Sequence, residues 1–449
     1  MIDLRDWLTR NALHIHAMVL KSKLAFISRA LAALLAISPA RSEPNAEPYP
    51  TPPSKKGLQV QMVDDALALG IKHAGLNCHL ASFVDLAQQP GSTRWSMDGQ
   101  EYFFKTRQVE RLDASVKPLS EAGVLVSLIL LNYENHHDAL DAIFMHPQYD
   151  RTAKTNHMGA FNTVTPDGTR HLRAVVAFLA ERYSARDAAH GRVWNYIVGN
   201  EVNSHWWWNN QGRATTAEIA SDYERAVRIV HDAVRLSSLK ARVFLSFEHH
   251  WGIRYPPGAP DQSSPGRELL AHFARFARER GDFDWHLAFH PYPEDLGEPC
   301  FWRDKSATQA DDSPRITFKN LEVLTRHLHK PELLFEGQPR RVILSEQGFH
   351  CPERPDGERD QAAAYCAAFW KVAHLEGIDS FILHRHVDHA HEGLNLGLWT
   401  HQPDTIATPD RHRQMYDIFR AADTPEWESA FRFALPVVGI EKWEDLLPK

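Results

Sequence analysis

Residues 193–201 read Val-Trp-Asn-Tyr-Ile-Val-Gly-Asn-Glu, an apolar run that stops at a glycine and is followed at once by a carboxylate. Residues 341–346, Arg-Val-Ile-Leu-Ser-Glu, have a similar form. Short runs that are apolar on both faces are typical of strands in a covered parallel sheet. In a barrel of alternating strands and helices, side chains at the carboxyl ends of the strands carry the chemistry. Glu201 and Glu346 are therefore the first candidates for functional residues.

The rest of the chain continues the alternation of strand and helix. Apolar runs predict further strands at 71–78, 124–131, 158–162, 242–247, 285–289 and 380–383. Amphipathic stretches predict helices at 59–69, 105–122, 169–183, 217–236, 266–280, 320–329, 361–376 and 411–421. About eight alternations favour a (β/α)8 TIM barrel, in which Glu201 ends strand four and Glu346 ends strand seven. A doubly wound open sheet is the alternative, but Leu76-Asn77-Cys78-His79 stands where its glycine-rich turn would follow strand one.

The predicted barrel occupies residues 57–422 as a single main domain, within a chain of 449 residues. Residues 1–40 are typical of a signal peptide, with lysines before an apolar stretch and a small residue, Ala40, at the expected cleavage point. A proline-rich flexible lead-in covers 41–56, and 423–449 is expected to pack on the barrel as a helical segment. We therefore expect a secreted or periplasmic protein without stable membrane insertion, an uncleaved anchor being the alternative.

The charge and the cysteines of the chain limit the partners and covalent links that we expect. The formal net charge of -7 provides no general basic surface for a nucleic acid, so no such partner is expected. Cys300 and Cys351 fall in loops after successive predicted strands, and in an oxidising compartment they could form a disulfide. Cys78 and Cys366 have the pattern of buried thiols.

The two glutamates fit the cleavage of a glycosidic bond. That reaction needs a proton for the leaving oxygen and a group that stabilises the cationic sugar carbon, which two carboxyl groups can supply. The two positions lie 346 − 201 = 145 residues apart, or about three strand-helix units of this barrel. We therefore expect both acids at the same mouth, with a carbohydrate substrate and no cofactor.

The residues around the acids resemble those of a known group. Asn200-Glu201 after strand four, His290-Pro291-Tyr292 after strand six and Glu346 after strand seven resemble the retaining glycoside hydrolases of the large "4/7" barrel clan, clan A. This resemblance implies that Glu201 is the acid/base, that Glu346 is the nucleophile and that Asn200 contacts the sugar 2-hydroxyl. In a retaining enzyme the two carboxyl groups are about 5 to 5.5 Å apart, against about 6.5 to 9.5 Å in an inverting one.

The sequence departs from the clan pattern at other strand ends. Clan members often carry an arginine after strand two and a histidine after strand three, whereas predicted strand two ends in Asn132-Tyr133. His136 and His137 are possible substitutes. A tryptophan often follows strand eight in the clan, but His384 and His386 stand there, and Trp399 comes later.

Substrate contacts are expected from polar and aromatic side chains near the strand ends. Sugar C–H faces pack on flat aromatic rings, and tryptophan adds an N–H donor for a hydroxyl. Trp206-Trp207-Trp208 and Trp251 follow strands four and five, although some of these rings could instead fill the core. The predicted substrate-binding residues are Asn200, His290, Tyr292, Trp206, Trp251, His384 and Asn132.

Two other functions are compatible with the sequence. A histidine-rich rim could hold a divalent metal for hydrolysis, since His-x-His at a strand end is a legitimate ligand spacing. Its members are His384, His386, Asp388, His389, His391, His249, His250 and His290. A metal centre would leave the placement of both glutamates unexplained, so we expect none. A barrel that binds glycan without cleaving it is the second alternative. Glu248 is a third carboxylate at the rim, able to bind hydroxyls or to form a salt bridge.

Overall fold

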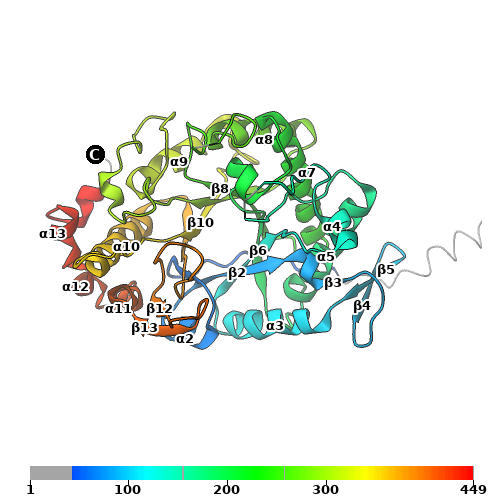
Figure 1. Cartoon of the computed structure of the whole chain (residues 1–449), viewed down its shortest axis with the longest axis horizontal. Coiled ribbons are helices and arrows are strands. Elements are labelled where there is room, and N and C mark those ends of the chain that lie inside the picture. The colour runs from blue at the N-terminus through cyan, green and yellow to red at the C-terminus, as the bar shows by residue number, and fades with distance from the viewer. Residues whose placement is uncertain (1–42, 154–155, 257, 448–449) are drawn as a thin grey trace, which may run out of the picture. The chain divides into compact units, whose positions relative to one another are not determined.

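Eight parallel strands close into a barrel in the computed structural model, which describes residues 43–153, 156–256 and 258–447 (Figure 1). Around the barrel the strands are β1 (Lys56–Gln59), β2 (His73–His79), β6 (Leu125–Leu131), β7 (Val193–Val198), β8 (Arg242–Glu248), β9 (Trp285–His290), β10 (Val342–Gln347) and β11 (Ile378–Leu383). The predicted TIM barrel is confirmed. The predicted signal peptide, 1–40, lies outside the described residues.

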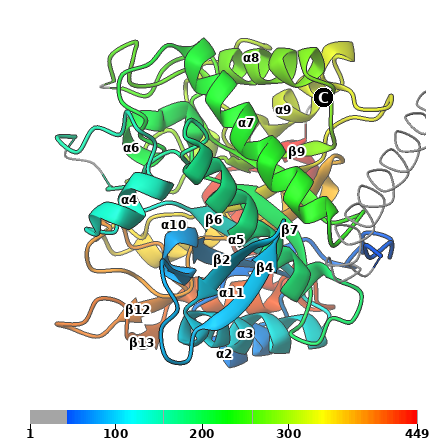
Figure 2. The ribbon, with the colours of Figure 1, turned by 90° about the vertical axis from the view of Figure 1, so that its right-hand side faces the viewer.

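Helices cover the outside of the barrel (Figures 1 and 2). They are α2 (Val63–Ala68), α3 (Thr106–Glu121), α4 (Asp138–Phe144), α5 (Pro166–Ser184), α7 (Thr216–Arg235), α8 (Gly266–Glu279), α9 (Leu321–His327), α10 (Gly357–His374) and α11 (Gln414–Ala421). Two small antiparallel sheets are added, β3 (Val84–Asp85) with β5 (Gln100–Phe104) and β4 (Thr93–Met97), and β12 (Trp399–His401) with β13 (Pro409–His412).

The helix faces follow the apolar periodicity of the sequence. Val109, Leu112, Val116 and Leu119 on α3 are all buried, as their spacing of three to four residues predicts. The start of α7 is fixed by a capping box, in which Thr215 and Glu218 satisfy each other's backbone N–H groups. Local sequence therefore determines where these helices begin and which face they turn to the barrel.

The start of the barrel differs from the prediction in two strands. The predicted helix 59–69 is present as the shorter helix α2, but β1, which comes before it, is not predicted. The predicted strand 158–162 is wrong, because this segment is a loop with isolated bridges, such as Tyr133 to Met158. One strand was missed and one was added before residue 193. The two errors cancel, so Glu201 still follows strand four and Glu346 still lies on strand seven.

β1 escapes prediction because it is short and carries little apolar surface. Only Leu58 among its four residues is a large apolar side chain. Gly57 is required by close packing: a Cβ there would lie 2.9 Å from His73 Cβ and 2.9 Å from Ile382 Cγ1. A strand selected for fit between its two neighbours has no periodic pattern to recognise.

The segments beside the barrel domain are in contact with it. In the part of the predicted lead-in that is described, Asn45 N–H donates to Ser237 O and the Tyr49 hydroxyl donates to Asn195 Oδ1. Near the other end, α12 (Trp427–Phe431) and α13 (Ala434–Val438) follow α11, and the Trp427 ring lies 6.0 Å from that of Phe369 on α10. No helix of the described residues is both long and apolar enough to span a bilayer.

The four cysteines, all within the described residues, are buried free thiols. The possible disulfide between Cys300 and Cys351 is therefore not formed in this structure. Burial raises the pKa of the Cys300 thiol to about 11, which keeps it protonated and unreactive at neutral pH.

Candidate active site

The floor of the barrel mouth is a small apolar layer. Inward-facing side chains of consecutive strands form it, namely Ile129, Leu131, Ile197, Phe244, Ala288 and Ile343, together with Met158 from a loop. Tyr133 and Trp208 are partly buried against this layer. Polar groups placed above it are therefore shielded on one side, which strengthens their mutual electrostatic interactions.

Glu201 is carried by a sharply turned backbone. After β7 ends at Val198, Gly199 has φ 73° and Glu201 itself has φ 42° and ψ 49°, in the left-handed region. A non-glycine residue there costs on the order of 1–3 kcal/mol, and such strain concentrates at functional sites. The Glu201 N–H donates to Ser246 Oγ on β8 at 3.1 Å, which helps to hold the turn.

Glu346 lies near the end of β10 and faces Glu201 across the mouth. A carboxylate oxygen of each glutamate and a ring nitrogen of His290 all lie within 4.8 Å of one another. Gln59 Nε2 donates to Glu346 Oε2 at 3.2 Å, and the Tyr292 hydroxyl donates to Glu346 Oε1 at 3.4 Å. The structure thus brings the two predicted acids together, with Tyr292 in its expected place beside Glu346.

The His290 ring contacts Glu201 and also Ser345, the residue before Glu346. Its Nδ1 lies 2.9 Å from Glu201 Oε1, and its Nε2 lies 3.0 Å from Ser345 Oγ. Although burial lowers the pKa of His290, the hydrogen bond to Glu201 and the charges of Glu346 and Glu201 raise it above its usual value. The imidazole therefore orients Glu201 and balances part of the negative charge of the mouth.

The environment separates the two carboxyl groups in acidity. Burial raises the pKa of Glu201, and the negative charge of Glu346 adds to that effect, while His290 opposes it. Burial would also raise the pKa of Glu346, but the charges of His384 and His290 and the Gln59 hydrogen bond bring it below its usual value. Such a divergence is how one site holds an acid and an anion at the same pH.

A chain of hydrogen bonds supports Glu346 from behind. Gln59 accepts at Oε1 from His384 Nδ1 at 2.7 Å, which turns the Gln59 amide nitrogen toward Glu346. His384 Nε2 in turn lies 2.7 Å from Glu392 Oε1, and Arg385 holds the other Glu392 oxygen at 2.8 Å. His384 is thus at the site as predicted, but it acts through Gln59 and through its charge.

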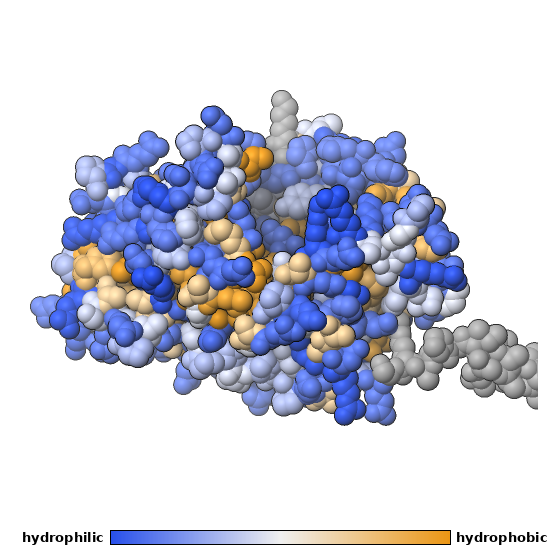
Figure 3. All heavy atoms as spheres, turned by 90° about the horizontal axis from the view of Figure 1, so that it is seen from below, coloured by the Kyte–Doolittle hydropathy of each residue, from blue (hydrophilic) through white to orange (hydrophobic). Residues whose placement is uncertain are grey.

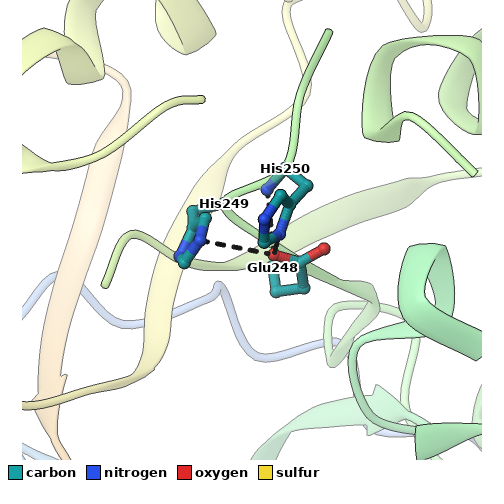
Figure 4. Close-up of side chains that lie close together, drawn as sticks. All are labelled: Glu248, His249 and His250. Atoms are coloured by element: carbon teal, nitrogen blue, oxygen red, sulfur yellow. Dashed lines mark hydrogen bonds and ion pairs between the residues drawn. The ribbon is translucent and has the colours of Figure 1, made fainter. Parts of the chain in front are cut away.

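Glu248, the third carboxylate of the rim, is occupied by protein donors (Figure 4). It accepts from Ser204 Oγ at 2.8 Å, and from His250 at the backbone N–H (2.9 Å) and ring Nδ1 (2.6 Å). Burial would raise the pKa of Glu248, but the charge and hydrogen bonds of His250, with the charge of His249, lower it to about 2. Glu248 is thus paired with His250, in line with one of its two predicted roles, while binding of sugar hydroxyls stays a prediction.

The spacing of these groups is that of hydrogen bonds. Two ligand atoms each about 2 Å from a tetrahedral ion are roughly 3.3 Å apart. The 2.6 Å between His250 Nδ1 and Glu248 Oε2, and the 2.9 Å between His290 Nδ1 and Glu201 Oε1, are shorter. Groups of possible ligands among the described residues are Glu248-His249-His250 and Glu201-His290-Glu346, and neither includes a residue of the stretch 384–391.

The side chains of residues 384–391 contact different partners and do not form a single cluster. His386 Nε2 lies 2.8 Å from Asp65 Oδ2, and Asp388 forms a buried ion pair with Arg413. Because Asp65 also accepts from the Trp399 indole N–H and the Tyr416 hydroxyl, these side chains tie the segment after β11 to α2 and α11.

The structure argues against two predicted substrate contacts, Trp251 and Asn132, while a sugar contact of Trp206 stays a prediction. Trp251 is fully buried, and its indole N–H donates to Asp311 O, so it offers no surface to a sugar. Asn132 is turned outward, where its amide donates to the Phe144 and Ala160 carbonyls, and Tyr133, one residue on, faces the mouth. Trp206 lies under the Arg213 guanidinium, and Trp208 is the tryptophan of this run that packs on the floor.

Other residues of the site were not predicted at all. Gln59 belongs to the strand that was missed, and Glu392 lies in a loop nine residues beyond the last barrel strand. Ser345 precedes Glu346, and its hydroxyl contacts His290 on the neighbouring strand. The alternation of side chains along β10 could have predicted the direction in which Ser345 points. Asn200 is buried next to Glu201, and its contact with a sugar hydroxyl stays a prediction.

Fold and site together define a (β/α)8 barrel with a facing pair of carboxyl groups at its mouth. The family model described as "Family of unknown function (DUF5722)" matches residues 48–446, and the chain belongs to that family. No curated protein matches the sequence.

Solved structures resemble the chain in fold. A beta-glucosidase from Pyrococcus furiosus has a TM-score of 0.54 at 16% identity and covers 84% of this chain and 86% of its own. A family 39 glycoside hydrolase from Bacteroides cellulosilyticus has a TM-score of 0.51 at 13% identity over 82% of this chain. This chain spans 62% of the length of that second protein. At such identities the likeness establishes only the barrel fold that this chain shares with these two proteins.

Proposed function

We propose that the protein is a retaining glycoside hydrolase that cleaves O-glycosidic bonds of a poly- or oligosaccharide, with Glu201 as acid/base and Glu346 as nucleophile. The observation that carries the proposal is the facing pair of carboxyl groups within 4.8 Å, Glu201 just after the fourth strand and Glu346 on the seventh. This separation is close to the spacing of about 5 to 5.5 Å in retaining enzymes and well below that of inverting ones. The shared fold with glycosidases supports it.

The reaction uses the two acids in two steps. Glu346 attacks the anomeric carbon while Glu201 gives its proton to the departing oxygen, so the bond to the leaving group breaks as a glycosyl ester forms. The negative charge of Glu346 is then lost, which removes one of the causes of the raised pKa of Glu201. Glu201 next takes a proton from water, which attacks the ester and restores both groups.

We also propose that residues 1–40 are a signal peptide that directs export, so that the enzyme acts outside the cytoplasm. The support is the composition of that leader, with Lys21 and Lys23 before an apolar stretch and Ala40 after it. N-terminal sequencing of the protein from a secreting host should give a mature chain that begins close to residue 41. Recovery of the full-length chain in the cytoplasm would contradict the proposal.

A substrate screen tests the activity itself. Purified protein is incubated with plant, algal and microbial polysaccharides, and the anomeric protons of the first products are followed by NMR. We expect hydrolysis of at least one glycan class, with products formed in the anomeric configuration of the substrate. Initial products of the opposite configuration would overturn the nucleophile assignment. Activity that is lost with chelator and restored by a divalent metal would favour the metal hydrolase, and binding without turnover would favour a non-catalytic barrel.

The dependence of rate on pH follows from the two carboxyl groups. kcat/KM should fall at low pH as Glu346 becomes protonated and at high pH as Glu201 becomes ionised, giving a bell. Because the pKa of Glu346 is lowered and that of Glu201 is raised, the plateau should be wider than two ordinary carboxyl groups allow. His290 lowers the pKa of both, so His290→Gln should move both limbs to higher pH.

A matched control for that substitution is His272→Gln, which removes a half-buried imidazole on α8. It should leave both limbs of the profile in place. An alkaline limb that does not move in His290→Gln would contradict the assignment of Glu201 as the group that must stay protonated.

A further inference from the structure

A cavity of about 410 Å³ opens beside the acid pair, at the ends of β11, β1 and β2 and along α3. Its size lies in the range of pockets that hold small ligands. Gln59 lines this cavity and also donates to Glu346, so the Gln59 side chain stands between a ligand in the cavity and the candidate nucleophile. We call this cavity the side cleft.

The side cleft exists because β1 is shorter than its neighbour. The last pair of the β1–β2 ladder is Gln59 with Gly75, whereas β2 continues to His79. Beyond Gly75 the wall between these two strands is open, and Asn77 is exposed although it lies on a barrel strand. The cavity extends from Gln59 to the side of α3, where Gln108, Arg111 and Ser115 line it.

The lining of the side cleft is basic and polar, although burial lowers the pKa of His79 and so favours its neutral form. Among the described residues that line it are two guanidinium groups and two imidazoles, with no carboxylate. This is unusual in a chain with 57 acidic and 50 basic residues. Figure 3 views the molecule from below Figure 1, the side on which α2 and α3 lie, and shows mostly hydrophilic residues with apolar patches near the centre and at the left. The recognition offered by the cleft is therefore polar and favours negative charge.

Arg111 is the group available to a ligand. It is exposed on α3, it donates to Gln108 Oε1 at 3.2 Å, and it forms no ion pair with any carboxylate of the described residues. By contrast, Arg385 holds Glu392 and His386 holds Asp65, so both are already committed. A planar guanidinium with free donors matches the two oxygens of a carboxylate or sulfate.

We propose that the side cleft binds a sugar unit carrying a carboxylate or sulfate group, with Arg111 as its partner, so that the substrate is an acidic glycan. Asn77 and Gln108 supply amide groups for the hydroxyls of the same unit. This inference rests on the proposed glycosidase function, because it names the class of substrate for the same mouth. It explains why a barrel strand at the mouth stops early and leaves a polar side chain open to solvent.

The test measures binding apart from turnover, in the Glu346→Gln protein. Titration calorimetry is carried out with a panel of uronate oligosaccharides, each paired with its carboxyl-reduced form, and of sulfated galactan oligosaccharides, each paired with its desulfated form. At least one acidic member should bind about tenfold or more tightly than its neutral counterpart, and added salt should weaken it. The two arms tell a carboxylate from a sulfate.

The variants decide whether Arg111 is responsible. Arg111→Gln should remove the preference for the acidic member, whereas Arg107→Gln, one turn earlier on α3 and outside the cleft, should keep it. Equal binding of every acidic and neutral pair, or an equal loss in the two variants, would overturn the inference. Cleavage of neutral glycans with no preference for acidic ones would contradict the inference about the side cleft and leave the proposed glycosidase function intact. Selective binding of acidic glycans without any cleavage would contradict the proposed function and leave the inference intact.

Discussion

Glu346→Ala should abolish hydrolysis of the natural glycan, with kcat reduced on the order of 10⁴-fold or more. The reason is that no other group of the mouth can form the glycosyl ester. Glu248 is held by Ser204 and His250, and Glu201 must remain protonated to serve the leaving group. The measurement is steady-state hydrolysis of the glycan identified in the screen, with far-ultraviolet circular dichroism to show that the fold is kept.

The control for that experiment removes a nearby charge that the mechanism does not use. Glu353 is exposed in the loop that follows β10, seven residues beyond Glu346. Glu353→Ala should keep wild-type activity. If Glu346→Ala retains more than about one hundredth of the wild-type rate, a covalent role for this carboxylate is contradicted.

The same variant distinguishes a nucleophile from an electrostatic group. Azide can enter the space that the missing carboxylate leaves and attack an activated aryl glycoside directly. The product should then be a glycosyl azide of inverted configuration, because only one displacement occurs. A retained glycosyl azide from Glu346→Ala would mean that another protein group still forms the ester.

The sequence could predict the two acids because each follows or ends a run of buried apolar residues. Such runs are recognised by composition alone, and the order of strands in the barrel then places their carboxyl ends together. The correct numbering of strands four and seven was nonetheless reached through two compensating errors, the missed β1 and the added strand at 158–162. The predicted proximity of Glu201 and Glu346 is therefore more accurate than the strand assignment from which it follows.

The surroundings of the acids could not be predicted as well, for a physical reason. Successive side chains of a strand point to opposite faces, so an error of one residue exchanges a pocket residue for a packing residue, as with Asn132 and Tyr133. Trp206 and Trp208 lie on the four-residue helix α6 (His205–Trp208), where no periodic pattern is long enough to fix a face. Gln59, His384 and Glu392 meet only through tertiary structure.

Glu201→Ala should lose hydrolysis of the natural glycan, and added azide should restore its turnover of an activated aryl glycoside. Without its acid, hydrolysis of the natural glycan should fall on the order of 10²–10⁴-fold. An aryl glycoside with a good leaving group needs no proton for the first step, so the glycosyl ester on Glu346 still forms. Its hydrolysis is slow, since no base remains to activate water.

Azide is an anion and needs no base, so it should release that ester and raise turnover of the aryl glycoside on the order of tenfold or more. The product should be a glycosyl azide with the configuration of the substrate, the opposite of the product from Glu346→Ala. Glu201→Gln is the matched variant, because its amide fills the space that azide would occupy and should reduce the rescue. The assignment of Glu201 as the base would be contradicted if azide rescued Glu346→Ala but left the turnover of Glu201→Ala unchanged. Glu201 would then have no role in the second step.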